Sequence, residues 1–210
     1  MTVIENGLLV DRNVEVKIFP SIQHGDLLKV NSIVLHRTNS PTAASVLNSY
    51  KAGQKTGAHF LVGKDGKIHQ TANLKRVCWH VGILQVRCLN ENNCETADFE
   101  NINALLHQKG MGFGTRVRKV SEHEKQKPYP LRYPVNAESL GIEVVGMFQR
   151  HTQDYEVPTQ AQLYQTQWLV RLLVGIYGLR ILSDVYAHGA IARKQPAEGS
   201  QLLRYIFSGA

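Results

Sequence analysis

The stretch NSIVLH (residues 31–36), followed by PTAASVLNSYKAG (residues 41–53), decides the class of fold. The first stretch is a short β-branched and apolar run, which favours a buried strand ending in His36. In the second, apolar residues recur with helical spacing, Thr42 is suited to cap the first turn, and Gly53 is typical of a helix end. A strand followed by a helix is the beginning of an α/β arrangement.

Strand and helix signals continue along the chain. Residues 58–71 predict a hairpin, because two strand-like runs flank the turn-forming pair Asp65-Gly66. Further elements are expected as a strand at 139–148, a helix from Thr159 to about Tyr177 that stops at Gly178, a strand or loop ending near His188, and a last amphipathic helix at about 198–207. We therefore expect one α/β domain over residues 1–210, with a central mixed β-sheet flanked by helices.

Residues 84–137 differ from the rest because they are polar and hold few long apolar runs. We expect a long inserted loop region with a short helix near Ile102–His107. Cys88 and Cys94 lie six residues apart within it and can form a disulfide in an oxidising compartment. The alternative is that both, together with Cys78, stay reduced in the cytosol.

Composition excludes several classes of protein. With 43% hydrophobic and 20% charged residues, the chain can bury a core and is not disordered as a whole. No apolar run approaches the roughly 20 residues that span a bilayer, so no membrane insertion is expected. The first residues lack a secretion signal, which predicts synthesis in the cytoplasm. The net charge of +7 favours a polyanionic partner, but the basic residues are too scattered to predict nucleic-acid binding.

Several side chains have the chemistry of a catalytic site. His36 and His188 each follow a strand-like run and could supply two ligands of a zinc site; surface or hydrogen-bonded core histidines are the alternative. Glu143 lies inside an apolar strand, as either a general base with a raised pKa or the partner of an arginine. Lys194 and Glu198 share an irregular segment with His188, which is either part of a site or a solvated loop. Motifs for nucleotide cofactors and for serine hydrolases are missing from the sequence.

Five segments in order resemble the type 2 N-acetylmuramoyl-L-alanine amidases, whose fold is shared by peptidoglycan recognition proteins and amidase-type phage lysozymes. The resemblance covers about residues 31–205, apart from the insertion at 84–137. Its segments are IVLHRTNS (33–40), GAHFLVGKDGKIHQTA (57–72), VCWHVG (77–82), NAESLGIEVVG (136–146) and AHGAIARKQPAEG (187–199).

The resemblance implies Zn²⁺ as cofactor, with His36 and His188 as two ligands. The family's third ligand is an Asp or Cys shortly after the second histidine. Here Pro196 stands at one expected ligand position and cannot bind metal, so Glu198, at a longer spacing, is the expected third ligand. Otherwise the metal has two histidines and water, or the site is degraded.

The same resemblance implies the remaining roles. Glu143 matches the glutamate that acts as general base in one branch, whereas another branch uses a tyrosine at the place of Ala58. Lys194 matches the lysine that stabilises the oxyanion. The pair Trp79-His80 matches a wall of the cleft.

His80 is expected to contact substrate, and His59 is predicted as a further substrate contact.

The resemblance implies hydrolysis of the amide between N-acetylmuramic acid and L-alanine in peptidoglycan. We expect an antibacterial effector of the type VI kind, with a cognate immunity protein as a further partner, or a phage lysin. Either would act in the periplasm or on the cell wall after specialised export. The alternatives are a cytosolic amidase that recycles wall fragments and a non-catalytic peptidoglycan-binding module.

Overall fold

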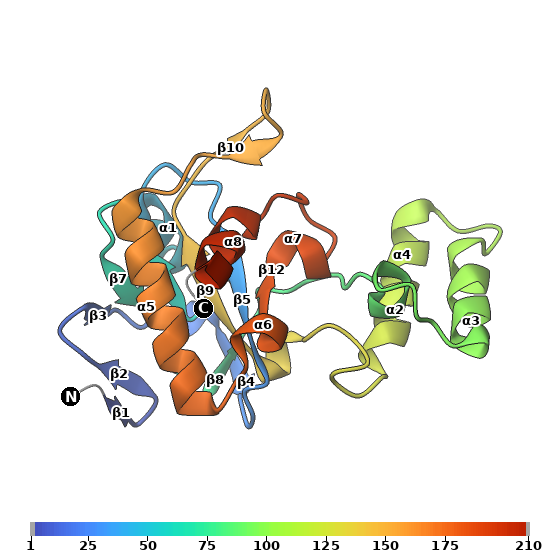
Figure 1. The fold of residues 1–210 in the computed structure, drawn as a ribbon, viewed down its shortest axis with the longest axis horizontal. Helices are drawn as coiled ribbons and strands as arrows, with labels where there is room; N and C mark the ends of the chain where they lie inside the picture. The colour runs from blue at the N-terminus through green and yellow to red at the C-terminus, as the bar shows by residue number, and fades with distance from the viewer. Residues whose placement is uncertain (1–2, 209–210) are drawn as a thin grey trace.

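A mixed β-sheet forms the centre of the computed structural model, which describes residues 3–208 (Figure 1). Within these residues the sheet has six strands in the order β12-β5-β9-β6-β7-β3. Neighbouring strands are parallel except for the antiparallel hairpin of β6 and β7. The strands are β3 (Val14–Val16), β5 (Ser32–Arg37), β6 (Phe60–Val62), β7 (Ile68–Gln70), β9 (Ser139–Val144) and β12 (Val185–Ala187). The predicted fold class is confirmed, with helices packed around this sheet.

Alternation along the two central strands separates the core from the site. Leu35 of β5 lies beside Ile142 of β9, and both are fully buried in the main apolar cluster. The next pair in the register is His36 and Glu143, which period-2 alternation turns to the opposite face of the sheet. The sheet therefore presents two chemically active side chains next to each other on the face away from the main core.

Two helices cover the apolar face of the sheet: the long α5 (Gln160–Tyr177) and the shorter α8 (Ser200–Ser208). Helix α5 begins at Thr159, whose hydroxyl accepts a hydrogen bond from the Gln162 N–H, and ends at Gly178 in the left-handed region. Both ends are as the sequence predicts. On the chain after β5, helix α1 (Ala43–Lys51) begins at Thr42, as expected.

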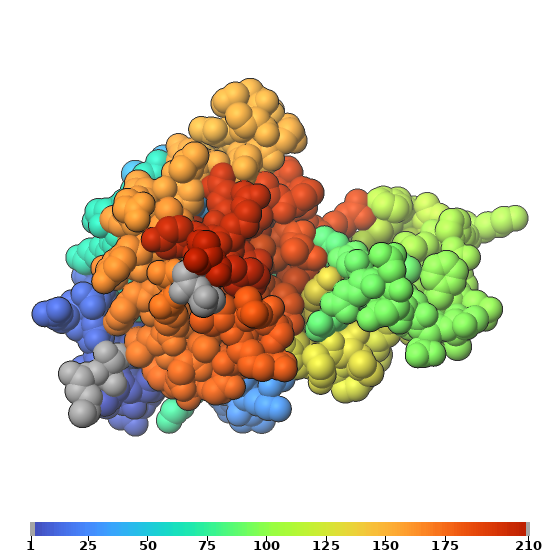
Figure 2. All heavy atoms as spheres, in the orientation of Figure 1, coloured from blue at the N-terminus to red at the C-terminus, as the bar shows by residue number. Residues whose placement is uncertain are grey.

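The inserted residues 84–137 hold three helices, so the prediction of a loop region with only one short helix is wrong. The short helix expected near Ile102–His107 overlaps the end of one of them. All of these residues are described, and they contain α2 (Arg87–Asn90), α3 (Thr96–Leu106) and α4 (Phe113–Lys125). They form a lobe that projects from one side of the molecule (Figures 1 and 2). Val86, Ile102 and Val120 give this inserted lobe a small apolar core of its own, which a search for long apolar runs overlooks.

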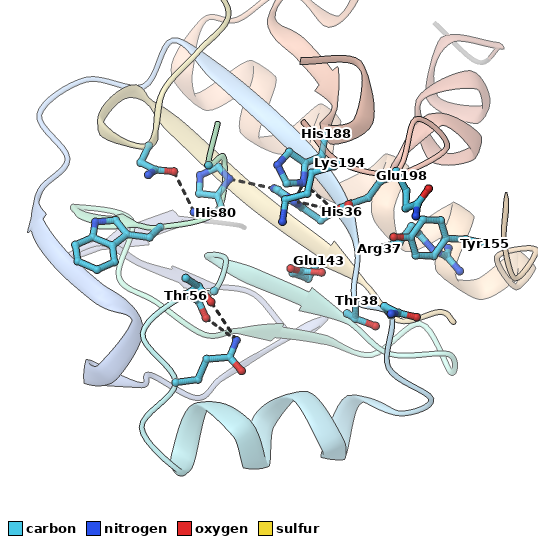
Figure 3. A pocket seen from close by; sticks show the side chains of 17 residues that line it. His36, Arg37, Thr38, Thr56, His80, Glu143, Tyr155, His188, Lys194 and Glu198 are labelled. Atoms are coloured by element: carbon cyan, nitrogen blue, oxygen red, sulfur yellow. Dashed lines mark hydrogen bonds and ion pairs between the residues drawn. The ribbon is translucent and has the colours of Figure 1, made fainter. Parts of the chain in front are cut away.

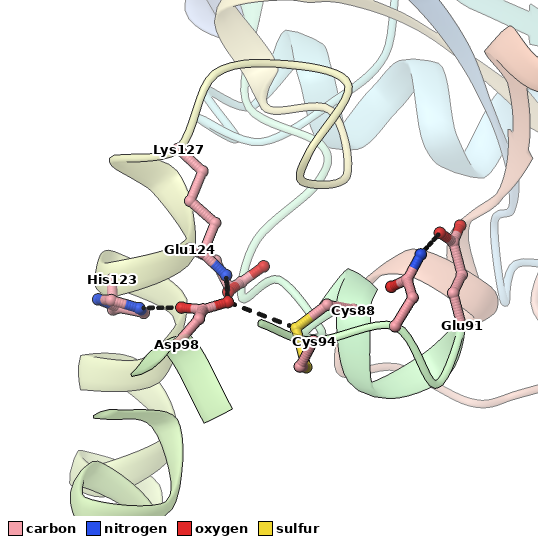
Figure 4. Close-up of a disulfide and its surroundings, with 8 residues drawn as sticks. Cys88, Glu91, Cys94, Asp98, His123, Glu124 and Lys127 are labelled. Carbon is pink, nitrogen blue, oxygen red and sulfur yellow. Dashed lines mark hydrogen bonds and ion pairs between the residues drawn. A yellow bond between two sulfur atoms is a disulfide. The ribbon is translucent and has the colours of Figure 1, made fainter. Parts of the chain in front are cut away.

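A disulfide joins Cys88 of α2 to Cys94 (Figure 4), one of the two alternatives left open by the sequence. Cys78 is a free, buried thiol. Close to the disulfide, Asp98 of α3 accepts hydrogen bonds from His123 of α4 (2.8 Å) and from Lys127 (2.6 Å). These polar contacts hold together helices whose apolar core is small.

The other elements are short and lie around the sheet: β1 (Val3–Glu5), β2 (Leu8–Val10), β4 (Gln23–Asp26), β8 (Arg76–Cys78), β10 (Phe148–Gln149), β11 (Asp154–Tyr155), α6 (Ile181–Asp184), α7 (His188–Ile191), and the 3-10 turns η1 (Pro20–Ile22) and η2 (Asn136–Glu138). Among the described helices, none is long and apolar enough to cross a membrane. The predicted domain bounds include residues 1–2 and 209–210, which lie outside the described residues.

Candidate active site

A pocket lies on the sheet face that carries His36 and Glu143 (Figure 3). Its walls come from segments far apart in the sequence, including the two central strands, the loop after β8, the hairpin of β10 and β11, and the loop before α8. The pocket is lined by His36, Arg37, Thr38, Asn39, Gln54, Thr56, Gly57, Trp79, His80, Gly82, Asn136, Glu143, Tyr155, His188, Lys194, Gln195 and Glu198.

Three side chains converge on one point of the pocket: His36, His188 and Glu198. His36 Nδ1 lies 2.9 Å from His188 Nδ1, which lies 2.7 Å from Glu198 Oε1. The third distance, from His36 Nδ1 to Glu198 Oε1, is 3.4 Å. All three residues are buried. The structure thus brings together the three residues named from the sequence as candidate ligands.

The hydrogen bonds around His188 and His80 fix which ring nitrogens carry protons. His188 Nε2 donates to the Val81 carbonyl (2.7 Å). In a neutral imidazole this leaves a lone pair on Nδ1, the other ring nitrogen. His80 Nε2 faces the Ser139 hydroxyl at 3.2 Å. The proton of that hydroxyl is donated to the Val135 carbonyl, so we assign the proton in the His80–Ser139 contact to His80.

This assignment propagates to His36. With Nε2 protonated, His80 accepts at Nδ1 from His36 Nε2, 3.0 Å away, and His36 Nδ1 carries a lone pair. His80 is held in turn from its backbone N–H, which donates to Asn136 Oδ1 (3.0 Å). A chain of positioned side chains therefore runs from Ser139 through His80 to the convergent site.

Protonation in this cluster suits metal ligands. Burial, and then the neighbouring His188, lowers the pKa of His36 to about 4. Burial also lowers the pKa of His80 well below its ordinary value, with the nearby His36 adding to the effect. Burial would raise the pKa of Glu198, but the close contacts with His188 and His36 outweigh it and lower that pKa to about 2. His36 is therefore a neutral imidazole and Glu198 a carboxylate near pH 7, the forms that bind a metal.

The three converging atoms fit a metal ion. Lone pairs that face each other at 2.7–3.4 Å need a shared cation between them, either a proton or a metal. In a tetrahedral site with bonds of about 2.0–2.1 Å, neighbouring donor atoms lie about 3.3 Å apart. Two imidazoles and one carboxylate form a donor set that zinc accepts, and the hydrogen bond from His188 Nε2 to a carbonyl is the usual outer contact of a metal-binding histidine.

Glu143 lies beside this cluster without a partner of its own. It is the register neighbour of His36, and its Oε2 atom is buried with no hydrogen bond to any described residue. Burial, and then the negative charge of Glu198, raises the pKa of Glu143 to about 8. The predicted alternative, an ion pair with an arginine, is not formed. With a pKa this close to neutral pH, the Glu143 side chain can both take up and release a proton.

Lys194 reaches the same pocket from the segment between His188 and Glu198. Two glycines let this segment fold tightly: a side chain at Gly189 would meet the Gln195 carbonyl, and one at Gly199, which has φ of +83°, would meet the Leu35 carbonyl. This folding explains how Glu198 joins the two histidines although Pro196 stands at an expected ligand position.

The residues predicted as substrate contacts separate into two groups. Trp79 and His80 line the pocket; Trp79 is 48% exposed and stacks on His24 with ring centroids 3.5 Å apart. His59 does not line it and is fully buried. Its Nε2 donates to the Arg76 carbonyl, and its Nδ1 accepts from the Gly141 N–H, so no ring nitrogen is left for a substrate. The geometry does not support the prediction for His59, whose bonds join β9 to the segment around β8.

Tyr155 and Arg37 are pocket residues that the sequence reasoning missed. The hydroxyl end of Tyr155 points toward the convergent cluster, and no described residue hydrogen-bonds to it (Figure 3). Arg37 lies over the Tyr155 ring at 6.0 Å and donates to the Glu156 carbonyl, which fixes the hairpin of β10 and β11. The position of Arg37 directly after His36 could have indicated that Arg37 lies near the pocket. Nothing local in the sequence places Tyr155 there.

The pocket combines a carboxyl group that can take up and release a proton, a cationic side chain and a set of metal-binding donors. These are the groups with which hydrolases attack an amide. The chain belongs to the N-acetylmuramoyl-L-alanine amidase family, whose model matches residues 26–199. No curated protein matches the sequence.

Solved structures share the fold at low sequence identity. AmpD is 16% identical with a TM-score of 0.54, over 97% of this chain and 98% of that chain. PlyL is 14% identical with a TM-score of 0.55, over 93% and 95%. An endolysin from Bacillus subtilis, solved as a mutant, is 19% identical with a TM-score of 0.51, over 92% and 97%.

Proposed function

We propose that the protein is a zinc-dependent amidase that cleaves the bond between N-acetylmuramic acid and L-alanine in peptidoglycan. Family membership supports the reaction class. The observation that carries the proposal is the register pair of His36 and Glu143, which sets a proton-exchanging carboxyl group beside three convergent metal-binding atoms. His36, His188 and Glu198 would hold the zinc ion. The chemistry that zinc supplies in such a site is acidification of water and polarisation of a carbonyl.

Glu143 acts as the general base in this proposal. Its unpartnered oxygen accepts a proton from the attacking water and afterwards passes it to the nitrogen of the leaving L-alanine. The raised pKa suits both steps, because it lies close to neutral pH.

Lys194 and Tyr155 act on the carbonyl side of the substrate. The ammonium of Lys194 stabilises the oxyanion as the carbonyl carbon becomes tetrahedral. The Tyr155 hydroxyl donates a hydrogen bond to the same oxyanion. Burial raises the pKa of Tyr155, so its hydroxyl remains a donor at neutral pH.

Trp79 and His80 form the wall on which the substrate lies. The stacked His24 supports one face of the Trp79 ring and leaves the other free for apolar parts of the glycan or peptide. His80 links this wall to the ligand His36.

The Cys88–Cys94 disulfide supports action in an oxidising space such as the periplasm. We infer an antibacterial effector or lysin that reaches the wall by specialised export, for which a cognate immunity protein is the expected partner. A cytosolic recycling amidase is the alternative enzyme.

Digestion of purified peptidoglycan, with and without a chelator, tests the proposal by mass spectrometry of the products. We expect free stem peptides that begin with L-alanine, lost on chelation and restored by zinc. Intact peptidoglycan that sediments together with the protein would instead indicate a non-catalytic binding module. Cleavage of intact wall, rather than only of small soluble fragments, separates a lysin or effector from a recycling enzyme.

A further inference from the structure

The segment that carries Lys194 is held from outside the pocket by residues at the base of the inserted lobe. The Arg193 N–H donates to the Ile83 carbonyl, and the Gln85 N–H donates to the Ile191 carbonyl, each at 2.8 Å. Leu84 and Ala192 form an antiparallel bridge between these two contacts. The backbone just before Lys194 is therefore paired with the backbone that leads into the lobe.

Gln85 adds a side-chain contact to this pairing. Its Nε2 donates to the carbonyls of Gly189 and Ala192, both at 3.0 Å. The Gly189 N–H donates in turn to the Glu198 carbonyl at 2.9 Å. The side-chain amide of Gln85, which lies outside the pocket, thus bridges the turn between His188 and Lys194.

Phe113, the first residue of α4, extends the contact into the lobe itself. The Arg193 guanidinium lies over the Phe113 ring at 4.5 Å, and Arg116 lies over the same ring at 6.0 Å. In Figure 2, red-orange atoms of the C-terminal part of the chain reach the edge of the lobe. Arg193 directly precedes Lys194, so the lobe holds the position next to the proposed oxyanion-binding residue.

Lys194 needs such support. Its side chain is exposed and makes no hydrogen bond or ion pair with another described residue, so only its backbone determines where the ammonium can reach. A long lysine side chain on a free loop would sample many positions, and small displacements of a catalytic group reduce rates steeply.

We propose that the inserted lobe is a positioning element for catalysis, with Gln85 and Phe113 as positioning residues that set Lys194 against the pocket. The proposal rests on the proposed amidase function. It gives residues 84–137 a role within the enzyme itself.

The test compares Phe113→Ala with Phe99→Ala, because Phe99 is a phenylalanine of the same lobe with similar exposure. Phe99 is 50% exposed and Phe113 is 55% exposed. Phe113→Tyr is the conservative variant, since it keeps the aromatic face under Arg193. Backbone hydrogen exchange of residues 189–198 is measured in each protein, together with zinc content, melting temperature, and kcat and KM on a soluble N-acetylmuramoyl peptide.

For Phe113→Ala we expect exchange of these amides to be about two- to fivefold faster and kcat to fall by a similar factor, with KM, zinc content and melting temperature nearly unchanged. Phe113→Tyr and Phe99→Ala should behave as the wild type. Arg193→Ala should resemble Phe113→Ala, and the double variant should lose no more than either single variant.

Unchanged exchange in Phe113→Ala would overturn the proposal, and so would faster exchange with unchanged kcat. An equal loss in Phe99→Ala would also overturn it, because the effect would then be general to the lobe. The exchange measurement does not depend on activity, and the wild-type digestion separately shows whether the amidase function itself is correct.

Discussion

Replacing Glu143 by glutamine should remove the activity of the protein. It should also change the pH dependence of stability: the stability of the variant, relative to that of the wild type, should increase as the pH rises from acid to neutral. Burial, and then the charge of Glu198, raises the pKa of Glu143 from 4.5 to about 8. At any pH between these two pKa values, the folded protein binds a proton at Glu143 that the unfolded chain does not bind. The stability tied to the protonated carboxyl is complete below the unfolded pKa and is lost as pH rises through the folded one.

The magnitude follows from the size of the shift. Each pH unit inside the window changes the free energy of unfolding by about 1.4 kcal/mol. Between about pH 5 and pH 7 the wild type should therefore lose about 3 kcal/mol relative to Glu143→Gln, and the difference should level off above about pH 8. Glutamine cannot ionise, so it has no such dependence. The glutamine amide itself adds an offset, because its site offers no partner, but this offset is constant with pH.

Urea unfolding, followed by circular dichroism from about pH 5 to pH 8 in the presence of a chelator, measures this difference. The control is Glu122→Gln on α4, whose side chain is 65% exposed and which should give curves parallel to wild type. Parallel curves for Glu143→Gln itself would refute our account of a buried, proton-bearing carboxyl. Retained amidase activity in this variant would remove Glu143 as general base.

Four further outcomes are expected. Lys194→Ala should keep its zinc but lower kcat by about 10²–10³, as measured on a soluble muropeptide; a loss below threefold would exclude its oxyanion role. Tyr155→Phe should lower kcat by about tenfold with an unchanged fold, because one hydrogen bond to the developing charge is lost, and wild-type kinetics would refute this. Glu198→Ala should lose zinc measured by metal analysis, and zinc retained at full occupancy would contradict its place as a ligand. Replacing Cys88 and Cys94 by serine should lower the free energy of unfolding by about 2 kcal/mol, as expected for so short a loop, and an unchanged urea midpoint would contradict that estimate.

Local signals in the sequence predicted the regular elements well. Thr159 and Gly178 mark the ends of α5 because capping and the left-handed turn depend on residue type at single positions. Asp65-Gly66 marks the β6–β7 hairpin for the same reason. Alternation along β9 already separated Glu143 from the apolar face, and the family resemblance named the three residues that the structure brings together.

The inserted lobe was mispredicted because its stability does not come from long apolar runs. Its core consists of a few residues separated in sequence, such as Val86, Ile102 and Val120, and a disulfide and partly buried polar contacts join its helices. None of these contacts leaves a periodic pattern in a short window of sequence.

Outside the inserted lobe, the sequence by itself therefore determined most of the elements and the class of fold, because backbone preferences and side-chain alternation act between near neighbours. The family resemblance supplied the metal-binding candidates. Only the tertiary structure decided how these residues work together. His36 and His80 are 44 residues apart, and Gln85 and Gly189 are 104 apart, yet each pair is joined by a hydrogen bond. The placement of Tyr155 in the pocket and the exclusion of His59 depend on the same kind of long-range packing, which no local pattern encodes.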